Sequence, residues 1–556
     1  MALRLYNTLS NQKEDFKEVV SGKVGIYVCG PTVYKDSHIG HAVGPVIFDA
    51  LKKYLVHMGF EVTLVINITD VDDKLIIESK KLGVTMAALA KKVTDSYFEC
   101  LTALGVDGVD HFPRATGHIP EIIAIIKTLE NKDAAYAVEG DVYFDITRDD
   151  DYGKLTNRCS DDQETGTRDL SSKTKRNPAD FALWKSAQAD EIGWDSPWGR
   201  GRPGWHIECS AMSMKLLGET FDIHGGGIDL VFPHHENEIA QSETATGKPF
   251  ANYWMHNGLT RMRTKAVSGE WKNEKMSKSL GNIKPIKALL ETIPGDALRY
   301  FLLSTQYRTP IDFSEEAVTA TLKGMHNIYR TLDRTERLAG QSVYASGQDA
   351  AIIDPASGDA AKALSETITR CEEKFFDCLE DDFNTAGALS ELSVLSNAVN
   401  RFIEVENLET AGSDDAFINA TNGAQQIAIL GQVLGLFTKS LEAAAGGGDI
   451  DNVIGLLVDI RKTAKEIKNF SLSDAIRDGV ISAGVTLEDR PDKTTGWQVN
   501  SREGTLNSLM TLVISLRQGV KDAKDFVMSD AIRDKGGAIG IVFEDRPDGT
   551  TGWRKQ

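Results

Sequence analysis

Apolar runs of strand length alternate with helical patterns in the first 120 residues of the chain. Residues 24–28 and 61–67 are largely apolar runs, which suit the central strands of a parallel sheet. Over residues 46–55 the apolar side chains fall on one helical face, and helical sequence continues to about Ala103. This alternation predicts a doubly wound α/β domain, in which ligands bind at the carboxyl ends of the strands.

The alternation stops over residues 121–200. A strand is predicted at 141–145, and residues 149–174 are polar and rich in turn-forming residues, so we expect an inserted connective segment. The sheet is expected to resume at 201–210. A further strand is predicted over 221–230, where it runs into a glycine turn.

Helical patterns dominate the second half of the chain. Residues 314–446 predict a helical bundle, and residues 443–448 form a small-residue linker. The tail contains an internal repeat, because residues 473–478 return as 529–534 at an offset of 56 (529 − 473 = 56). We interpret the tail as one small helix-plus-hairpin module that has been duplicated.

Composition indicates a globular chain of several domains. It has 556 residues, of which 41% are hydrophobic and 26% charged, and no apolar run long enough to cross a bilayer. Six cysteines in so long a chain form no disulfide framework, and residues 1–7 lack the apolar core of a secretion signal. A cytoplasmic location and no membrane partner are therefore expected. The net charge of −19 argues against a nucleic-acid partner, although it leaves room for a local basic face.

Two histidines follow the first predicted strand. His38 and His41 are expected on the first turn of the next helix, beside backbone N–H groups that suit phosphate. Taken alone, they are equally consistent with ordinary helix-start residues. A second motif, Lys-Met-Ser-Lys-Ser, lies far downstream at residues 275–279. The two motifs in this order resemble the signature of the class I aminoacyl-tRNA synthetases.

Four side chains form a candidate metal site. Cys29 ends the first predicted strand, Cys209 lies far along the chain, and a helix start predicted at 233–240 places His234 and Glu238 four residues apart on one face. Two thiolates, an imidazole and a carboxylate are a credible zinc set. The spacing of the two cysteines alone favours buried apolar residues instead. The same interpretation applies to the other cysteines, which are Cys100, Cys159, Cys371 and Cys378.

The chain resembles the bacterial cysteinyl-tRNA synthetases over nearly its whole length. The motifs that carry the resemblance lie at residues 27–34, 67–74, 204–210, 224–227 and 233–238. The resemblance implies one zinc ion per chain at the floor of the amino-acid pocket, bound by Cys29, Cys209, His234 and Glu238. Such a metal makes chemical sense, because an apolar pocket separates near-isosteres such as cysteine and serine only ~10–200-fold. Zinc binds thiolate far more strongly than alcohol, so no editing domain would be needed.

The resemblance also implies the reaction. The cysteine carboxylate would attack the α-phosphate of ATP to give cysteinyl-adenylate, and the cysteinyl group would then pass to tRNA(Cys). Mg²⁺ should accompany ATP, with no protein ligand assigned. The residues implied for catalysis are His38, His41, Lys275 and Lys278; those implied for ATP binding are His38, His41, Gly226, Asp229 and Lys278; those implied for L-cysteine binding are Gly30, Thr69 and Trp205.

A domain plan follows from the same resemblance. We expect a Rossmann-like catalytic domain in two halves at 1–120 and 201–313, an inserted segment at 121–200, a helical bundle at 314–446, and small C-terminal α+β modules of the anticodon-binding type at 447–498 and 499–556. Two features depart from the family pattern, because the segment from Asn257 to Lys275 is longer than usual and the module is doubled. Trp497 or Trp553 could stack on an anticodon base or close the core of its module, and the sequence leaves both alternatives open.

Two other functions fit part of the sequence. A cysteine ligase that acts on an amino sugar would share the zinc pocket and the adenylation chemistry, but it should lack residues 314–556. A non-catalytic tRNA-binding paralogue should carry a damaged motif or zinc ligand, and none is damaged. The sequence therefore favours an enzyme that charges tRNA(Cys) with cysteine. A monomer is expected, although no sequence feature determines the oligomeric state.

Overall fold

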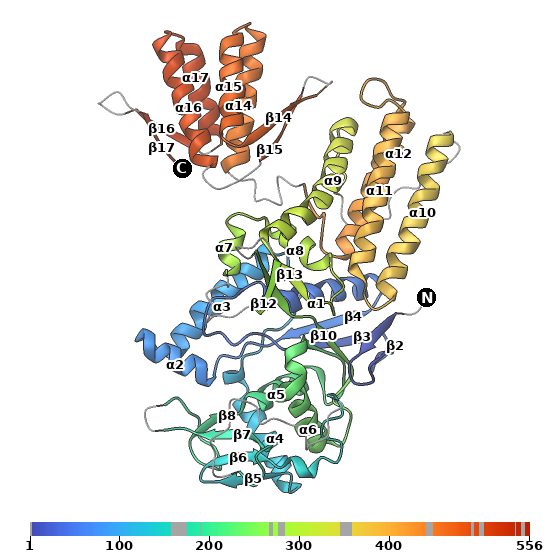
Figure 1. The fold of residues 1–556 in the computed structure, drawn as a ribbon, viewed down its shortest axis with the longest axis vertical. Helices are drawn as coiled ribbons and strands as arrows, with labels where there is room; N and C mark the ends of the chain where they lie inside the picture. Colours follow the sequence, from blue (N-terminus) through green and yellow to red (C-terminus); the bar gives the residue numbers. More distant parts are fainter. Residues whose placement is uncertain are drawn as a thin grey trace.

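The computed structural model of the chain has three parts along its length (Figure 1). It describes residues 3–156, 175–188, 191–265, 271–275, 284–344, 358–440, 449–490, 494–499, 505–539, 541–545 and 551–555. An α/β region comes first, a bundle of long helices follows, and a unit of helices and hairpins ends the chain. This architecture confirms the predicted fold class.

The α/β region is built on a four-stranded parallel sheet with the strand order β10-β9-β3-β4. Its strands are β3 (Lys23–Val28), β4 (Glu61–Ile66), β9 (Phe221–Gly227) and β10 (Ala251–Asn257). The chain passes from β3 through helix α1 (Gly40–His57) to β4 on one side, and later adds β9 and β10 on the other. The strand order therefore reverses between β3 and β9, which is where doubly wound sheets bind ligands.

Shorter elements surround this sheet. They are the hairpin of β1 (Arg4–Asn7) and β2 (Gln12–Asp15), the helices α2 (Asp73–Leu82), α3 (Met86–Ala103), α5 (Trp205–Leu217) and α6 (Glu236–Thr246), and the short helical turns η1 (Ala115–Gly117), η2 (Ile146–Arg148), η4 (Ile228–Leu230) and η5 (Val231–His235). The insertion adds helix α4 and a separate antiparallel sheet with the order β5-β6-β7-β8 (Figure 1). Its elements are α4 (Ile119–Asn131), β5 (Ala135–Val138), β6 (Asp141–Phe144), β7 (Phe181–Ser186) and β8 (Gly201–Pro203).

The expectation that the parallel sheet resumes at 201–210 is wrong. Strand β8 pairs with β7 in the insertion, and helix α5 begins at Trp205. Residues 206–213 of this helix are all buried. A helix that is buried on every side has no polar face, so its sequence lacks the periodicity that distinguishes it from a strand.

The expectation that His38 lies on the first turn of a helix is also wrong. Helix α1 begins at Gly40, and only His41 lies on its first turn. Before the helix, His38 pairs with Pro285 in an isolated antiparallel bridge, and the Ile286 N–H donates to the Ser37 carbonyl (2.8 Å). This pairing keeps the backbone extended up to His38.

A three-stranded sheet with the order β12-β11-β13 links the α/β region to the bundle. Strands β11 (Thr260–Lys265) and β12 (Trp271–Lys275) pair antiparallel as a hairpin in the long segment before Lys275, and β13 (Ile311–Phe313) runs parallel to β11. Helices α7 (Ile286–Leu290) and α8 (Gly295–Leu303) precede β13. Lys278 and the side chain of Lys275 lie outside the described part of the chain.

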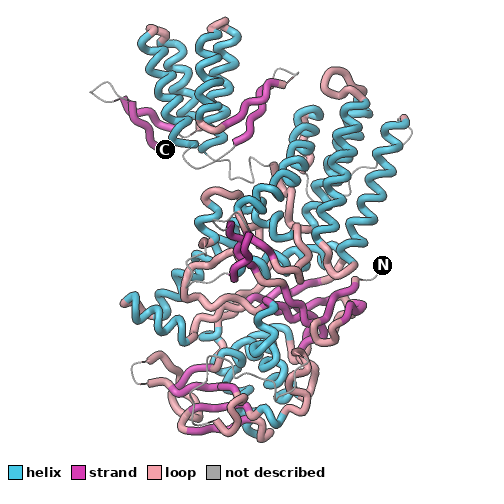
Figure 2. The backbone as a smooth tube through the Cα atoms, in the orientation of Figure 1, coloured by secondary structure: helices cyan, strands magenta, loops and turns pink. Residues whose placement is uncertain are grey.

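Four long helices form the bundle that follows, and Figure 2 shows them in cyan. They are α9 (Glu315–Ala339), α10 (Asp359–Glu380), α11 (Thr385–Val405) and α12 (Asp414–Val433). One apolar core runs from the parallel sheet into this bundle without a break. The bundle therefore packs directly on the α/β region.

The C-terminal unit contains two copies of the same set of elements. The first copy has α14 (Asp449–Glu466), α15 (Phe470–Ser482), β14 (Val485–Asp489) and β15 (Thr495–Val499); the second has α16 (Thr505–Asp522), α17 (Phe526–Ala538), β16 (Ile541–Asp545) and β17 (Thr551–Lys555). Helix α14 packs on α16, and side chains of both copies share one apolar core. Trp497 and Trp553 are partly buried against this core, which favours the alternative in which each closes the core of its module.

Candidate functional site: a thiol, histidine and carboxylate cluster at the sheet edge

Cys29 lies directly after β3, at the carboxyl edge of the parallel sheet. Its backbone N–H donates to the carbonyl of Gly225 in β9 (3.0 Å). The next residue has to be a glycine, because a Cβ on Gly30 would lie 1.7 Å from the carbonyl oxygen of Asn67. The Gly30 N–H also donates to the Asn67 side chain (2.8 Å). Pairing with neighbouring strands therefore fixes the position of the Cys29 thiol.

The other three candidate ligands come from two buried helical segments. Helix α5 supplies Cys209, and the turn η5 with helix α6 supplies His234 and Glu238. His234 Nε2 lies 2.9 Å from Glu238 Oε1, so the four-residue spacing does bring this pair into contact. All three side chains are buried.

Three distances between these four side chains fit the edges of a zinc tetrahedron, whereas the 2.9 Å between His234 Nε2 and Glu238 Oε1 is shorter than the expected edge of about 3.3 Å. Bonds of about 2.3 Å to sulfur and about 2.0 Å to nitrogen imply edges of about 3.8 Å between two sulfurs and about 3.5 Å between sulfur and nitrogen or oxygen. The observed distances are 3.8 Å from Cys29 Sγ to Cys209 Sγ and 3.5 Å from Cys209 Sγ to His234 Nε2. Cys29 Sγ lies 3.5 Å from Glu238 Oε1. The cluster can therefore hold a tetrahedral metal ion.

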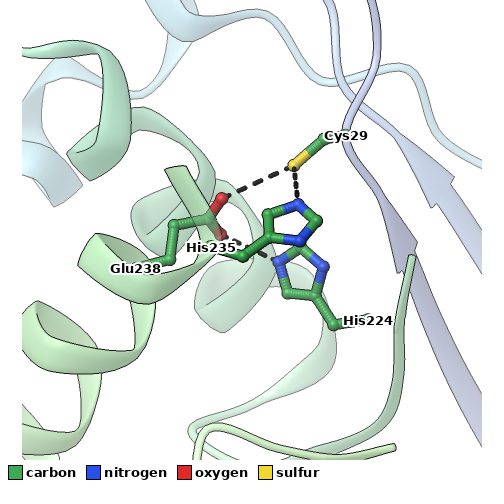
Figure 3. Close-up of side chains that lie close together, drawn as sticks. All are labelled: Cys29, His224, His235 and Glu238. Carbon is green, nitrogen blue, oxygen red and sulfur yellow. Dashed lines mark hydrogen bonds and ion pairs between the residues drawn. The ribbon is translucent and has the colours of Figure 1, made fainter. Parts of the chain in front are cut away.

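A second possible ligand group shares two of these residues. Cys29, His224, His235 and Glu238 also bring one ligand atom each within 4.8 Å of one another. Figure 3 shows the His235 imidazole next to the Cys29 thiol and the His224 imidazole next to the Glu238 carboxylate. His235 Nε2 lies 3.3 Å from Cys29 Sγ, and His224 Nε2 lies 2.8 Å from Glu238 Oε2.

His224 has no role in the sequence interpretation, although it stands in a motif that carries the resemblance. His224 contacts Oε2 of Glu238, whereas Cys29 lies next to Oε1. A histidine in this position can orient the carboxylate of a metal ligand without binding the metal itself. The ring of His224 stacks on Trp254 with centroids 4.4 Å apart. A signal was available in the sequence, because His224 belongs to a predicted strand at the same sheet edge as Cys29.

Neighbouring groups favour the ligand forms of Glu238 and Cys209. Although burial opposes protonation of His234, these two side chains in turn raise its pKa to about 10, so its imidazole is protonated without a metal. Burial opposes ionisation of Glu238, but His224 and His234 lower its pKa to about 2. Burial also opposes ionisation of Cys209, but the Cys29 thiol and His234 lower its pKa to about 6. Burial holds the pKa of His235 well below its usual value, so this imidazole is neutral. A carboxylate and a thiolate are the forms that bind a metal cation.

The residues expected at cysteine lie around this cluster. The Trp205 ring stacks on His234 with centroids 4.1 Å apart and an interplanar angle of 24°. Thr69 is buried, and its hydroxyl accepts a hydrogen bond from the Asn67 amide (3.3 Å). Because Asn67 also binds the Gly30 N–H, one side chain joins two of the three expected residues. The structure thus places Gly30, Thr69 and Trp205 beside the candidate metal site.

The residues expected at ATP lie at the carboxyl ends of β3 and β9. The rings of His38 and His41 stack with centroids 3.9 Å apart, although only His41 belongs to α1. Gly226 lies at the end of β9, where an added Cβ would come within 2.8 Å of the His235 ring. Asp229 is exposed in the turn that follows. The expected lysines cannot be placed, because Lys278 and the Lys275 side chain fall outside the described residues.

Comparison with known proteins identifies the class of this chain. Residues 15–323 match the family described as "tRNA synthetases class I (C) catalytic domain", and residues 374–438 match the DALR domain. The methionyl-tRNA synthetase of Mycobacterium tuberculosis, solved with methionyl-adenylate, has the same fold with a TM-score of 0.55 and 17% identity, covering 78% of this chain and 94% of that one. The chain belongs to the class I aminoacyl-tRNA synthetases.

Sequence relatives narrow this class to one family. A relative from Geobacter sulfurreducens named cysteine--tRNA ligase is 45% identical over 512 residues, which cover 90% of this chain and all of the relative. A relative of the same name from Heliobacterium modesticaldum is 44% identical over 492 residues, covering 88% of this chain and 98% of the relative. The chain belongs to the cysteine--tRNA ligase family of enzymes, which confirms the predicted resemblance. Among the described residues, no helix combines the length and apolarity needed to span a bilayer.

Proposed function

We propose that this protein uses ATP to join L-cysteine to tRNA(Cys) through a cysteinyl-adenylate, and that zinc recognises the thiol of cysteine. The observation that carries the proposal is the cluster of Cys29, Cys209, His234 and Glu238 in a chain of the cysteine--tRNA ligase family. These residues would hold one zinc ion. When bound, zinc supplies a Lewis acid that prefers thiolate to alcohol.

The pocket walls support cysteine as the amino acid. Trp205 covers the His234 ring, and Gly30 leaves no side chain between the strand end and the Asn67 carbonyl. Thr69 presents a hydroxyl on the same side, where it can orient the substrate through a hydrogen bond.

Adenylate formation needs positioning and charge stabilisation rather than a protein nucleophile. The stacked imidazoles of His38 and His41 would bind the ATP phosphates at the start of α1, where the helix dipole favours negative charge. Gly226 would let adenosine approach the backbone, and Asp229 would accept its ribose hydroxyls. Lys275 and Lys278 would stabilise the α-phosphate and the leaving pyrophosphate, with Mg²⁺ bound to ATP.

Cysteine-dependent exchange of labelled pyrophosphate into ATP tests the first step. We expect exchange with cysteine, and exchange with serine reduced by more than the roughly 200-fold that an apolar pocket can give. A serine-dependent exchange that is reduced by less than this limit would contradict zinc recognition. The absence of any cysteine-dependent exchange in zinc-loaded protein would contradict adenylation. Exchange followed by transfer to an amino sugar rather than tRNA would favour the alternative ligase. Action as a monomer and a cytoplasmic location stay predictions.

A further inference from the structure

Asp382 is a buried carboxylate in the turn between α10 and α11, outside the candidate site. Its side chain is fully buried, and its backbone has φ of 64°. The left-handed region is unfavourable for a residue with a side chain, so the surroundings must hold this turn in place. Phe383, the next residue, is also fully buried and has φ of 48°.

The Asp382 carboxylate binds groups from two other segments. Its Oδ1 accepts hydrogen bonds from the Tyr6 N–H and the Tyr307 hydroxyl, both at 2.8 Å. Its Oδ2 pairs with Arg308, with 2.8 Å to Nε and 2.6 Å to Nη2. The side chain of Gln306 donates to the Asp382 backbone carbonyl (2.9 Å). One bundle residue thereby fixes the N-terminal hairpin and the segment 306–308.

Segment 306–308 is followed by β13, which pairs with β11, and β11 in turn pairs with β12, the strand that ends at Lys275. The Tyr307 carbonyl accepts from the Gly258 N–H (2.8 Å), and the Ile311 N–H donates to the Leu259 carbonyl (3.0 Å). A Cβ on Gly258 would lie 2.4 Å from the Thr309 carbonyl oxygen, so the two backbones are in close contact. Strand β13 then runs along β11, whose Arg261 pairs in register with Lys275 of β12.

We propose that Asp382 is a positioning residue that fixes the root of the β11–β12 hairpin, and with it the backbone of Lys275, relative to the nucleotide site. This inference rests on the proposed function for the role of Lys275. It assigns the helical bundle a part in ATP handling. Segment 306–308 bonds directly to the backbone next to β11. The Tyr6 bond reaches the cluster around Cys29 only through a longer series of contacts, from Thr8 to His256 and His235. The larger effect should therefore fall on ATP.

The chain offers a matched control at the same boundary. Asp49 of α1 and Arg299 of α8 form another fully buried ion pair, with 2.6 Å between Oδ2 and Nη2. Arg299 also donates to the Leu434 carbonyl beyond α12, so this pair ties the α/β region to the bundle as well. Within the described part of the chain, the hydrogen bonds of Asp49 and Arg299 do not involve segment 258–260 or segment 306–308. Asp49→Asn therefore removes a comparable ion pair without touching the proposed connection.

The test compares Asp382→Asn and Tyr307→Phe with Asp49→Asn in the full-length protein. Pyrophosphate exchange gives KM for ATP and for cysteine, and hydrogen–deuterium exchange reports backbone protection of residues 258–265. We expect Asp382→Asn to raise KM for ATP about tenfold, to change KM for cysteine less than about twofold, and to lower protection at 258–265. Tyr307→Phe preserves the aromatic ring and therefore the fold. It should also raise KM for ATP and lower protection at 258–265, but by smaller amounts than Asp382→Asn. Asp49→Asn should lower thermal stability without the ATP effect.

Equal KM changes in Asp382→Asn and Asp49→Asn would overturn the proposal, as would a loss of stability in Asp382→Asn with both KM values unchanged. If Asp382→Asn does not fold, unchanged KM for ATP and unchanged protection in Tyr307→Phe would overturn it. Failure of the proposed function is distinguishable, because the unmodified protein would then show no cysteine-dependent exchange. Protection at 258–265 needs no substrate and would still decide the positioning claim.

Discussion

The candidate metal site and the C-terminal unit show two opposite ways in which a chain brings residues together. Cys29 and Glu238 lie far apart in sequence, yet their ligand atoms are 3.5 Å apart because two sheet-edge segments meet. The C-terminal unit instead packs two neighbouring copies of one module, so that Leu457 and its equivalent Val513 (513 − 457 = 56) are both fully buried in one core. The contacts of the candidate metal site depend on the topology of the whole α/β region, whereas the core of the C-terminal unit depends only on packing between two neighbouring modules.

This comparison implies different responses to mutation. A site assembled from distant segments loses its function when one ligand is removed, although the fold around it persists. In a core shared by two equivalent copies, a core substitution in either copy should lower the stability of the whole unit by a similar amount. The following predictions test that difference, in order of expected effect.

Cys209→Ser should have the largest effect. Replacing a thiolate with an alcohol removes one of two sulfur ligands. Zinc content and cysteine-dependent exchange should therefore fall by more than the ~10–100-fold loss that is typical when a residue hydrogen-bonded to a metal ligand is mutated. Zinc is measured by mass spectrometry, beside the exchange assay. Cys378→Ser is the control, since Cys378 is a half-buried thiol in the bundle. Unchanged zinc content in Cys209→Ser would contradict the ligand assignment.

His224→Gln should have the next largest effect. Loss of the 2.8 Å contact to Glu238 Oε2 should weaken zinc binding about 10–100-fold while one ion per chain still binds at saturation. Competition with a chromogenic chelator measures the affinity, with His326→Gln in α9 as the control. A loss of stoichiometry rather than affinity would show instead that His224 is itself a ligand, as the second group in Figure 3 allows.

Leu457→Ala and Val513→Ala should destabilise the same folding unit. We expect losses of about 2–5 kcal/mol for the leucine and about 1–3 kcal/mol for the valine, because each leaves a cavity in the shared core. Denaturant unfolding followed by hydrogen exchange of both copies measures the effect. Val527→Ala, at a side chain that is 84% exposed, should change little. If each variant loosened only its own copy, the copies would be independent modules.

Removing the ion pair between Arg461 and Asp489 should change the free energy of unfolding least. Arg461 lowers the pKa of Asp489, so the pair stabilises the folded state above the unfolded pKa of about 3.9 and loses this contribution as pH falls further. Because half of the Asp489 side chain is exposed, Arg461→Met should cost about 1 kcal/mol or less at pH 7. Urea unfolding at pH 7, 5 and 3.5 measures the difference, which should shrink only at the lowest pH. A difference independent of pH would exclude this ion pair as its source.

Particular elements show how far the sequence could predict this molecule. Strands β3 and β4 and helix α1 carry clear apolar patterns and are predicted close to their observed bounds. The sequence does not distinguish helix α5 from a strand, because residues 206–213 are all buried and the periodic signal of an exposed face is missing. The extended backbone at His38 could not be predicted, since its partner Pro285 is distant in sequence.

The candidate site shows the same limit. The spacing of His234 and Glu238 predicts their contact locally, because four residues make about one helical turn. Cys29 and Cys209 could be joined only through the resemblance, since nothing local relates them. The predicted strand places His224 at the same sheet edge as Cys29, but sequence spacing predicts neither its contact with Glu238 nor the contact of His235 with Cys29.

Transfer of labelled cysteine to a tRNA transcript with a GCA anticodon tests the central claim most directly. We predict ATP-dependent charging by the zinc-loaded full-length protein that excess serine does not compete away. Charging without ATP, charging with serine, or no charging while cysteine-dependent pyrophosphate exchange persists would contradict the account.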